Sequence, residues 1–382
     1  MLKCQKSKFQ LDPTVTYLNN AYMSPLLKSA EEAGIQGLIK KRNPFNYSNH
    51  EFIDDVVRLK EAFGKLIGAP YRQVAIVPSV SYGMSNIANN LKPKPNGRVI
   101  LAEGQFPSHY YTWSNFAEAN QQKLQIVKSN PILKSWIKKW NDDILAAIDE
   151  DVIAVCLGHC HWADGSLFNL KEIRAKCKTT NTYLIIDGTQ SVGAMPLNLK
   201  EIPFDALIVG GYKWLMGHYG LGCAYYSEAF NDGIPIEDNW INKKDSSNFE
   251  RLVDYTNEFE PGAARYSVGE QSSFCLVPML MAGINQILDW GVENVYKYDS
   301  SLQQRLSENL SGSNYDLPIL GESSGHLTGI RIGSDMDMTA IKKKLLENKI
   351  YVSYRADAIR VSMHVYNDTD DIDKFSEVLQ SC

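Results

Sequence analysis

Residues 207–228 contain a lysine in surroundings that do not favour one. Lys213 follows the apolar run 207–209 and a pair of glycines, and a second apolar run, 221–226, comes almost at once. Lysine is almost never fully buried unless it is paired or chemically useful. The glycines allow the backbone to turn tightly or to approach a bound group closely. We therefore expect Lys213 to be either a surface residue in an unusual context or a residue with a covalent role.

A carboxylate and an amide follow another apolar run. Asp187 stands near the end of the segment 182–188, TYLIIDG, and Gln190 lies three residues beyond it. Pyridoxal phosphate requires a lysine that bonds to it and a carboxylate that keeps its ring nitrogen protonated. Lys213 and Asp187 fit these two roles, and Gln190 is placed to reach the same ring.

The same cofactor requires an anion site and an aromatic face. A helix expected to begin after the segment 77–81, VPSVS, offers N–H groups and the hydroxyl of Ser81 to a phosphate, and Phe106 offers an aromatic face. Taken singly, Asp187 has the alternative role of a cap, Phe106 that of a core residue and Ser81 that of an N-cap. Their occurrence together with Lys213, in this chain order, favours the cofactor site.

Short apolar runs with polar ends predict the elements that position these residues. The runs are 73–79, 98–105, 151–159, 182–188 and 204–211. Continuous apolar strands are typical of a sheet buried on both faces, which is usually parallel. Helical patterns lie between them, so we expect an α/β architecture with helices on both sides of the sheet. Ligands of such sheets bind at the carboxyl ends of the strands, where the candidate residues stand.

The pattern changes after about residue 265. Residues 270–291 are typical of a long helix that ends at Gly291, and a strand, a helix, a pair of strands and a last helix are expected to follow. Asn367 is the expected N-cap of that last helix. We interpret this region as a smaller α+β domain. The lysine-rich segment 133–143 is expected to be a helix that turns two tryptophans inward.

Composition limits the class of protein. The chain has 382 residues, 44% hydrophobic and 22% charged, with a formal net charge of −5, the profile of a soluble globular protein. It has no basic excess, no apolar stretch near the roughly 20 residues of a membrane span and no apolar N-terminal signal. We therefore expect no nucleic-acid or membrane partner and a cytoplasmic location.

Cysteine usage argues against a disulfide-rich protein and against a zinc protein. The seven cysteines are odd in number and irregular in spacing, so a disulfide framework is not expected. The segment 156–164, CLGHCHWAD, is rich in possible metal ligands, but no second ligand pair follows at the spacing of a zinc site. We expect no metal.

Several motifs resemble one family across nearly the whole chain. YLNNAYMSPL (17–26), FPSH (106–109), DGTQSVGAMPLNL (187–199), YKWLMGHYGLG (212–222) and IRVSMHVYNDTDDID (359–373) are similar to motifs of the class V aminotransferase and cysteine desulfurase superfamily. This resemblance implies the cofactor pyridoxal 5'-phosphate and fold type I of the enzymes that use it. That α/β fold has a large domain, with a mostly parallel sheet of the seven-stranded type between helices, and a smaller α+β domain. The implied boundaries are 18–265 for the large domain, with 1–17 and 266–382 forming the small one.

The resemblance also implies roles for individual residues. Lys213 and Asp187 are the expected catalytic residues, and Arg360 is expected to grip the carboxylate of the substrate. The expected cofactor-binding residues are Lys213, Asp187, Gln190, Phe106, Ser81, Val80, His109, Tyr212, His161 and Trp240. The expected substrate-binding residues are Arg360, Asn20, Tyr22 and Arg265.

Two departures from the superfamily narrow the chemistry. Its desulfurases carry a catalytic cysteine before the C-terminal arginine, whereas KIYVSYRADAIR (349–360) has none, so persulfide chemistry is disfavoured. Many members reach the phosphate of the partner subunit with a Gly-Thr pair, whereas PGAARYSVGE (261–270) has alanines there. Arg265 or Trp240 is expected to take over that role. The partner-subunit contacts of the family imply a homodimer.

The expected activity is that of an aminotransferase, which acts on an amino acid and passes its amino group to a 2-oxo acid. A lyase that eliminates a β-substituent, including C–S elimination, and an epimerase share the first chemical steps and remain open. A nicotinamide- or nucleotide-binding protein is disfavoured, because neither G-x-G-x-x-G nor G-x-x-x-x-G-K-[ST] occurs. A non-catalytic protein with this fold is also disfavoured, because it has no need of Lys213, Asp187 and Arg360 together.

Overall fold

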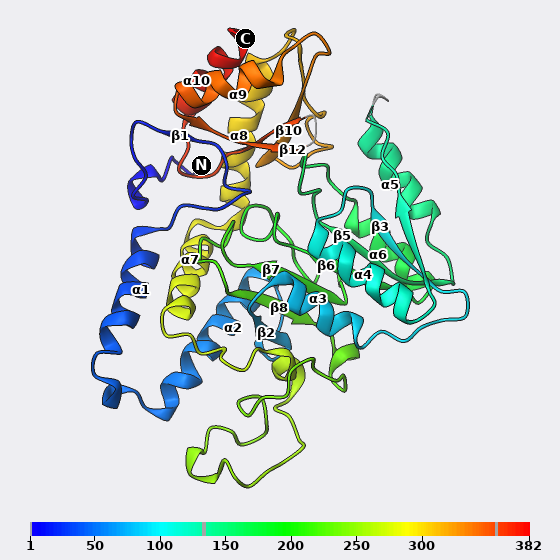
Figure 1. Cartoon of the computed structure of the whole chain (residues 1–382), viewed down its shortest axis with the longest axis vertical. Helices are drawn as coiled ribbons and strands as arrows, with labels where there is room; N and C mark the ends of the chain where they lie inside the picture. The colour runs from blue at the N-terminus through cyan, green and yellow to red at the C-terminus, as the bar shows by residue number, and fades with distance from the viewer. Residues whose placement is uncertain (1, 132–134, 356–357) are drawn as a thin grey trace.

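A seven-stranded sheet forms the centre of the large part of the molecule (Figure 1). The computed structural model describes residues 2–131, 135–355 and 358–382. In spatial order the strands are β2 (Val74–Val77), β8 (Gly222–Tyr226), β7 (Ala206–Gly210), β6 (Tyr183–Asp187), β5 (Val152–Gly158), β3 (Arg98–Ala102) and β4 (Lys123–Val127). Only β8 runs antiparallel to its neighbours, β2 and β7. The expectation of a mostly parallel, seven-stranded sheet is therefore confirmed.

The apolar runs form strands because both faces of this sheet are covered. Every residue of β2, β5, β7 and β8 is buried. On one face the strands pack against α3 (Val80–Ala88) and α4 (Pro107–Ala119). On the other face they pack against α2 (Asp54–Ile67), α5 (Trp136–Ala146), α6 (Leu170–Thr179) and α7 (Leu276–Trp290). Burial on both sides explains why these strands lack the alternation of a half-exposed sheet.

Two helix predictions were correct in kind and differ in detail. The helix expected at 270–291 begins only at Leu276, and Gly291 ends it with a φ of 76°, a conformation that glycine adopts without steric cost. In α5, Trp136 and Trp140 are buried as expected, while residues 133 and 134 of the predicted range lie outside the described residues. Helix α7 also packs against α1 (Lys28–Lys40), beside α2 (Figure 1).

The C-terminal region forms a second sheet with its own core. Its strand order is β12 (Ser353–Arg355), β13 (Ala358–Ser362), β10 (Leu327–Ile332) and β9 (Tyr315–Asp316), all antiparallel. Helices α8 (Val292–Asn309), α9 (Met338–Glu347) and α10 (Thr369–Gln380) pack against it. The expected order of strand, helix, strand pair and helix is present, within the α+β arrangement that the sequence indicated.

The N-cap predicted for the last helix was wrong by one residue. Asp368 caps α10, because its side chain accepts a hydrogen bond from the N–H of Asp371. Asn367 instead donates its amide to the carbonyl oxygen of Tyr17. The hydrogen bond of Asn367 to the N-terminal segment joins residues far apart in the sequence. The local sequence around the start of α10 therefore could not predict it.

The N-terminal segment joins the two parts of the molecule. Strand β1 (Thr16–Tyr17) pairs in parallel with β11 (Ile350–Tyr351), and Leu18 is buried in the core of the C-terminal region. Helix α7, by contrast, contributes to the core of the large sheet. The domain boundaries at residues 17/18 and 265/266 stay a prediction. Of the helices that the structure describes, none is long and apolar enough to cross a membrane.

Helix α7 approaches the chain beside Lys213 so closely that only glycine fits. A Cβ added at Gly283 would lie 2.1 Å from the carbonyl oxygen of Leu215. We expect Gly283→Ala to lower the free energy of unfolding by about 1–3 kcal/mol, although alanine favours a helix, because the overpacked backbone must move. Denaturant unfolding measures the change.

The matched control is Gly34→Ala on α1. There an added Cβ would meet the sulfur of Met279, the outer part of a flexible side chain that can move aside. Equal stability losses in the two variants would contradict the proposed backbone contact.

Candidate active site

Residues at or just after the carboxyl ends of β2, β6 and β7 line one cavity. Asp187 ends β6 and pairs in register with Ile208 of β7, and the chain leaves β7 for Lys213. The cavity has a volume of about 210 Å³. Its lining residues are Pro78, Ser79, Val80, Ser81, Phe106, Ser108, Trp162, Asp187, Thr189, Gln190, Gly210, Tyr212, Lys213, Tyr219, Gly220 and Leu221. Most of the cofactor-binding residues expected from the sequence are therefore brought together.

Lys213 is buried, so its interpretation as a surface residue was wrong, while its covalent role stays a prediction. Its side chain is only 7% exposed, and its Nζ lies 5.9 Å from the ring centroid of Phe106. Within the described ranges no carboxylate forms an ion pair with it. Burial, followed by the positive charge of Arg360, lowers the pKa of Lys213 to about 8, while Asp187 opposes this shift. A substantial fraction of the amine is therefore unprotonated in mildly alkaline solution.

The glycines before Lys213 allow a close backbone crossing. The N–H of Gly211 donates to the carbonyl oxygen of Leu221 at 2.9 Å, and a Cβ on Gly211 would lie 2.6 Å from that same oxygen. The N–H of Gly217 donates back to the carbonyl oxygen of Gly211. These bonds fold the segment after β7 into a compact turn that holds Lys213 over the end of the sheet.

Asp187 is only partly used by the protein. Its Oδ1 accepts a hydrogen bond from the N–H of Thr189 at 3.0 Å. The hydroxyl of Thr189 accepts from the N–H of Gly210, so this short network ties the ends of β6 and β7 together. No hydrogen bond from the described part of the chain reaches Oδ2, which leaves that oxygen able to bind a cationic N–H of a ligand.

A buried histidine beside Asp187 has one unused nitrogen. The side-chain amide nitrogen of Gln105 donates to Nδ1 of His109 at 2.7 Å, so the hydrogen of the neutral ring is on Nε2. Among the described residues Nε2 has no hydrogen-bond partner. Burial lowers the pKa of His109 to about 4, with Asp187 opposing, so the ring is neutral near pH 7. An orphaned buried N–H is the kind of group that a ligand satisfies.

The start of α3 lies at the cavity wall. Ser79, not Ser81, is the N-cap: its Oγ accepts from the N–H of Tyr82. The hydroxyl of Ser81 lies 2.9 Å from that of Ser79. The N–H groups of Val80 and Ser81 belong to the first turn and have no partner within the helix. Together with the helix dipole, they favour a phosphate group there.

Gln190 lines the cavity, but its amide is already occupied. Its Nε2 donates to the carbonyl oxygen of Ala21 at 3.0 Å, and its Oε1 accepts from Nε1 of Trp214 at 2.9 Å. The amide thus ties the N-terminal segment to the residue after Lys213. Its expected contact with a cofactor ring stays a prediction.

Arg360 approaches the site from the second sheet. It is 1% exposed, its Nη1 donates to the carbonyl oxygen of Trp162 at 2.9 Å, and its Nη2 donates to the hydroxyl of Ser353 at 3.3 Å. Burial, followed by the charge of Arg355, lowers the pKa of Arg360 to about 9. Its Nε has no partner among the described residues, and the two bonds above use only two of its five N–H groups, so the guanidinium keeps donors for a ligand.

Two residues near the site were missed in the sequence. The ring of Trp162 packs edge-on against Phe106 at 5.3 Å, and the guanidinium carbons of Arg355 and Arg360 lie 5.4 and 5.9 Å from its centroid. Trp162 stands among the possible metal ligands of the segment 156–164, which gave no prediction for its aromatic ring. Arg355 stands in the same C-terminal segment as Arg360. The presence of a second arginine in that segment was the sequence signal that could have predicted it as a residue near the site.

Other expected residues lie outside the cavity lining. Asn20 is buried and its Oδ1 accepts from the hydroxyl of Tyr366, whereas Tyr22 is 56% exposed. His161 contacts Asp164 and the carbonyl oxygen of Gly104. Arg265 donates to the carbonyl oxygen of Gly233 at 3.0 Å. The roles assigned to these residues stay predictions.

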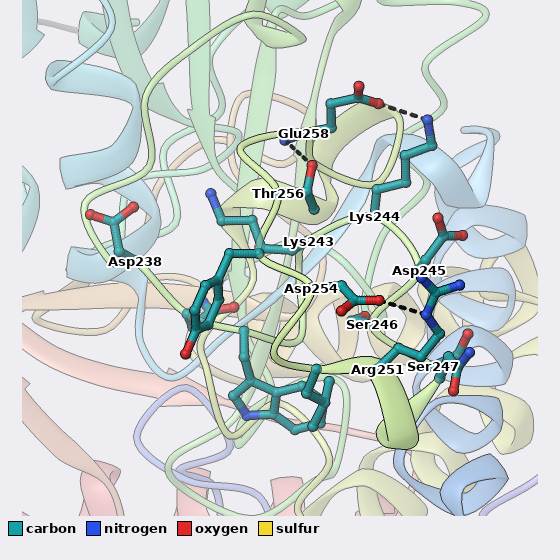
Figure 2. A pocket seen from close by; sticks show the side chains of 15 residues that line it. Asp238, Lys243, Lys244, Asp245, Ser246, Ser247, Arg251, Asp254, Thr256 and Glu258 are labelled. Atoms are coloured by element: carbon teal, nitrogen blue, oxygen red, sulfur yellow. Dashed lines mark hydrogen bonds and ion pairs between the residues drawn. The ribbon is translucent and has the colours of Figure 1, made fainter.

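Trp240 lines a different, larger cavity of about 640 Å³, whose other lining residues are shown in Figure 2. The charged side chains there are partly paired with one another: Lys244 binds Glu258, and Arg251 binds Asp254. This cavity belongs to the segment between η5 (Glu228–Phe230) and α7 and shares no lining residue with the Lys213 cavity. In residues 2–131, 135–355 and 358–382, no group of three or more metal-binding side chains could hold a metal ion.

The chain is similar to known proteins over most of its length. The family model described as aminotransferase class-V matches residues 42–375. An uncharacterized aminotransferase, YcbU of Bacillus subtilis, is 22% identical over 84% of this chain and 82% of its own length. Isopenicillin N epimerase of Streptomyces clavuligerus is 20% identical over 98% of this chain and 97% of its own length.

Solved structures share the fold at low sequence identity. C-DES with glycine covalently linked to its PLP cofactor superimposes with a TM-score of 0.87 at 18% identity, covering 98% of this chain and 99% of that one. The cysteine desulfurase of Thermococcus onnurineus NA1 has a TM-score of 0.84 at 17% identity, covering 100% and 98% of the two chains.

The charge of Arg360 near Lys213 can be tested without any cofactor. Acetic anhydride modifies only an unprotonated amine, so the pH midpoint of Lys213 labelling, read by mass spectrometry of its peptide, reports its pKa. We expect a midpoint near 8 in the cofactor-free protein and a higher one in Arg360→Gln, which lacks the cation that disfavours protonation. Arg305→Gln is the control, because Arg305 pairs with Asp373 on the surface. The same midpoint in Arg360→Gln as in the unmodified protein would contradict the influence of Arg360.

Proposed function

The chain belongs to the aminotransferase class-V family of pyridoxal phosphate enzymes, and on this premise we propose that it transfers the amino group of an amino acid to a 2-oxo acid. One observation supports this proposal above the others. The amine of Lys213 is buried beside the cavity that Asp187 also lines, and no carboxylate of the described residues pairs with it. A buried, unpaired amine costs free energy, so its presence favours a chemical role.

The residues around the cavity fit the cofactor of the family. We propose that the start of α3, with Val80 and Ser81, holds the phosphate and that Asp187 holds the proton of the ring nitrogen. A charge-assisted hydrogen bond of this kind is roughly twice as strong as a neutral one. Phe106 provides the aromatic face, and the Nε2–H of His109 is a further buried donor that a ligand oxygen would satisfy.

When bound, pyridoxal phosphate supplies an electron sink for an amino acid that is joined to it. The role that we assign to Lys213 is acid–base catalysis at the α-carbon of the substrate. Its Nζ accepts the α-proton, holds it, and returns it to another atom. A lowered pKa of about 8 suits this role, because general bases work best when their pKa lies near the working pH.

Arg360 is the proposed anchor of the substrate carboxylate. Its planar guanidinium matches a carboxylate with two parallel hydrogen bonds, and its Nε is without a partner among the described residues. The contacts with Trp162 and Ser353 hold the guanidinium in one orientation. A fixed anchor of this kind would direct the α-hydrogen of the substrate toward Lys213.

A β-eliminating lyase is the second candidate and an epimerase the third, because proton removal by Lys213 is common to all three reactions.

Cysteine desulfuration is disfavoured by the state of the nearby thiol. Cys160 is buried, its Sγ donates to the carbonyl oxygen of Gln190, and burial raises its pKa to about 12. The nucleophile in persulfide chemistry is a thiolate, which this environment strongly disfavours. A homodimer and a cytoplasmic location also stay predictions.

Covalent attachment of the cofactor is the first test of the proposal. We expect borohydride to fix pyridoxal phosphate on Lys213, and peptide mass spectrometry to find the added mass there. Lys60, a second buried lysine whose pKa is lowered, is the internal control and should stay unmodified, because it lies outside the cavity. Attachment at any lysine other than 213 would overturn the assignment.

The role of Arg360 can be separated from a structural one with two substrates. We expect Arg360→Lys to keep the yellow colour of the bound cofactor and to lose at least about tenfold in kcat/KM for amino acids, because an ammonium cannot form the paired bonds. An amine substrate without a carboxylate should be nearly unaffected. Equal losses for both substrates would assign Arg360 to the scaffold.

A further inference from the structure

A second buried lysine lines a separate cavity of about 340 Å³. The cavity lies between α2, the start of β2, the segment 241–247 and the segment 260–264. It shares no lining residue with the cavity of Lys213. Strand β2 connects the two, because Val74 at its start lines this cavity and Pro78 just after its end lines the other.

Lys60 occupies a position on α2 where an apolar residue is the ordinary choice. It lies on the buried face of the helix with Val56, Leu59 and Phe63, and it is 8% exposed. In the part of the chain that the structure describes, its amine forms neither a hydrogen bond nor an ion pair. Burial lowers its pKa to about 8, against the opposing influence of Cys223 and Glu260. A buried cation without a counter-ion is costly, and an anionic ligand would remove that cost.

Among the other polar residues that line the same cavity, Glu260 and Gln271 bear most directly on what it can bind. Glu260 is half-buried, and its carboxylate forms no ion pair with any described cation, Lys60 included. Gln271 is 6% exposed, its Nε2 donates to Asn242, and its Oε1 has no partner among the described residues. The cavity thus presents the buried amine of Lys60, the carboxylate of Glu260 and the unused acceptor of Gln271, which do not satisfy one another, and Arg72 is a second, exposed cation of the lining.

The other lining residues comprise a polar group, Tyr71, Arg72, Asn242, Ser246 and Ser247, and an aliphatic face. Val56 and Val57 of α2, Val74 of β2, Ile241 and Ala264 all contribute to that face. Such a face suits a small branched hydrocarbon group, and the volume is that of a small-molecule site. A ligand complementary to all these features carries a carboxylate, an ammonium group and an aliphatic side chain.

We propose that this cavity binds a free aliphatic α-amino acid of about the size of leucine. Its carboxylate binds the ammonium of Lys60, its ammonium binds Glu260 and the Oε1 of Gln271, and its side chain packs against the valines. The site is distinct from the Lys213 cavity and does not depend on the proposed aminotransferase activity.

The test measures binding of L-leucine to the holoenzyme by equilibrium dialysis, while the absorbance of the cofactor reports occupancy of the Lys213 cavity. We expect binding that exceeds what the absorbance change accounts for. Three analogues each lack one feature: 4-methylpentanoate lacks the ammonium, 3-methylbutylamine lacks the carboxylate, and glycine lacks the side chain. Each should bind the second site at least about tenfold more weakly, the expected cost of an unpaired buried charge or an unfilled apolar wall.

Variants assign the binding to this cavity. Lys60→Met keeps the length of the side chain and removes its charge, and Glu260→Gln removes the anion. Both should lose the second site and keep the absorbance response to amino acids. Lys65→Met, on the exposed side of the same helix, should keep both.

Unchanged leucine binding in Lys60→Met, or binding fully accounted for by the absorbance change, would overturn the proposal. If Lys60→Met fails to fold, Glu260→Gln carries the same test, because its carboxylate is half-buried and lies in a loop segment. Absence of aminotransferase activity would leave this result intact, because dialysis does not require turnover.

Discussion

Burial of the Lys213 amine is the constraint on which the surrounding structure depends. Lys213 is 7% exposed and has no paired carboxylate in the described residues. Its surroundings therefore disfavour the charged ammonium and favour the neutral amine. Helix α7 covers the turn with Gly283 directly against the carbonyl oxygen of Leu215, and Gly211 brings the crossing strand within hydrogen-bond distance. These close contacts fix the turn that carries the amine. The charge of Arg360, delivered by the second sheet, adds to the effect of burial on the pKa of Lys213.

The parts of the site that the sequence predicted are those that depend on a single strand end. Asp187, Lys213 and Phe106 follow apolar runs, and parallel pairing of those runs is sufficient to gather them at one edge. The sheet itself was predictable for the same reason, because strands buried on both faces are continuous apolar segments. Helix boundaries were less so: α7 begins six residues later than its pattern indicated, and Asp368 replaced Asn367 as the cap of α10.

What the sequence did not predict depends on contacts between distant segments. Trp162 lies among possible metal ligands, and only folding puts its ring between Phe106 and two arginines. The amide of Gln190 looked free to face a ring, yet it bonds to Ala21, which is 169 residues away. Lys60 is part of an ordinary amphipathic pattern, and nothing local distinguishes it from the exposed Lys65. Burial of one and exposure of the other follow from how α2 packs against the sheet.

The way in which Arg360 reaches the site affects how the molecule matures. During synthesis, the strands of the large sheet and Lys213 are complete before β13 exists, because Arg360 comes much later in the chain. Contacts between residues so far apart in sequence form late and slowly. The nascent protein therefore passes through a stage in which the amine is present without its neighbouring cation, and in which its proton affinity is higher than in the finished molecule. The contribution of Arg360 to the lowered pKa of Lys213 thus arises only when the second sheet docks, so under the acid–base role proposed for Lys213 its chemistry would be completed by the last steps of folding.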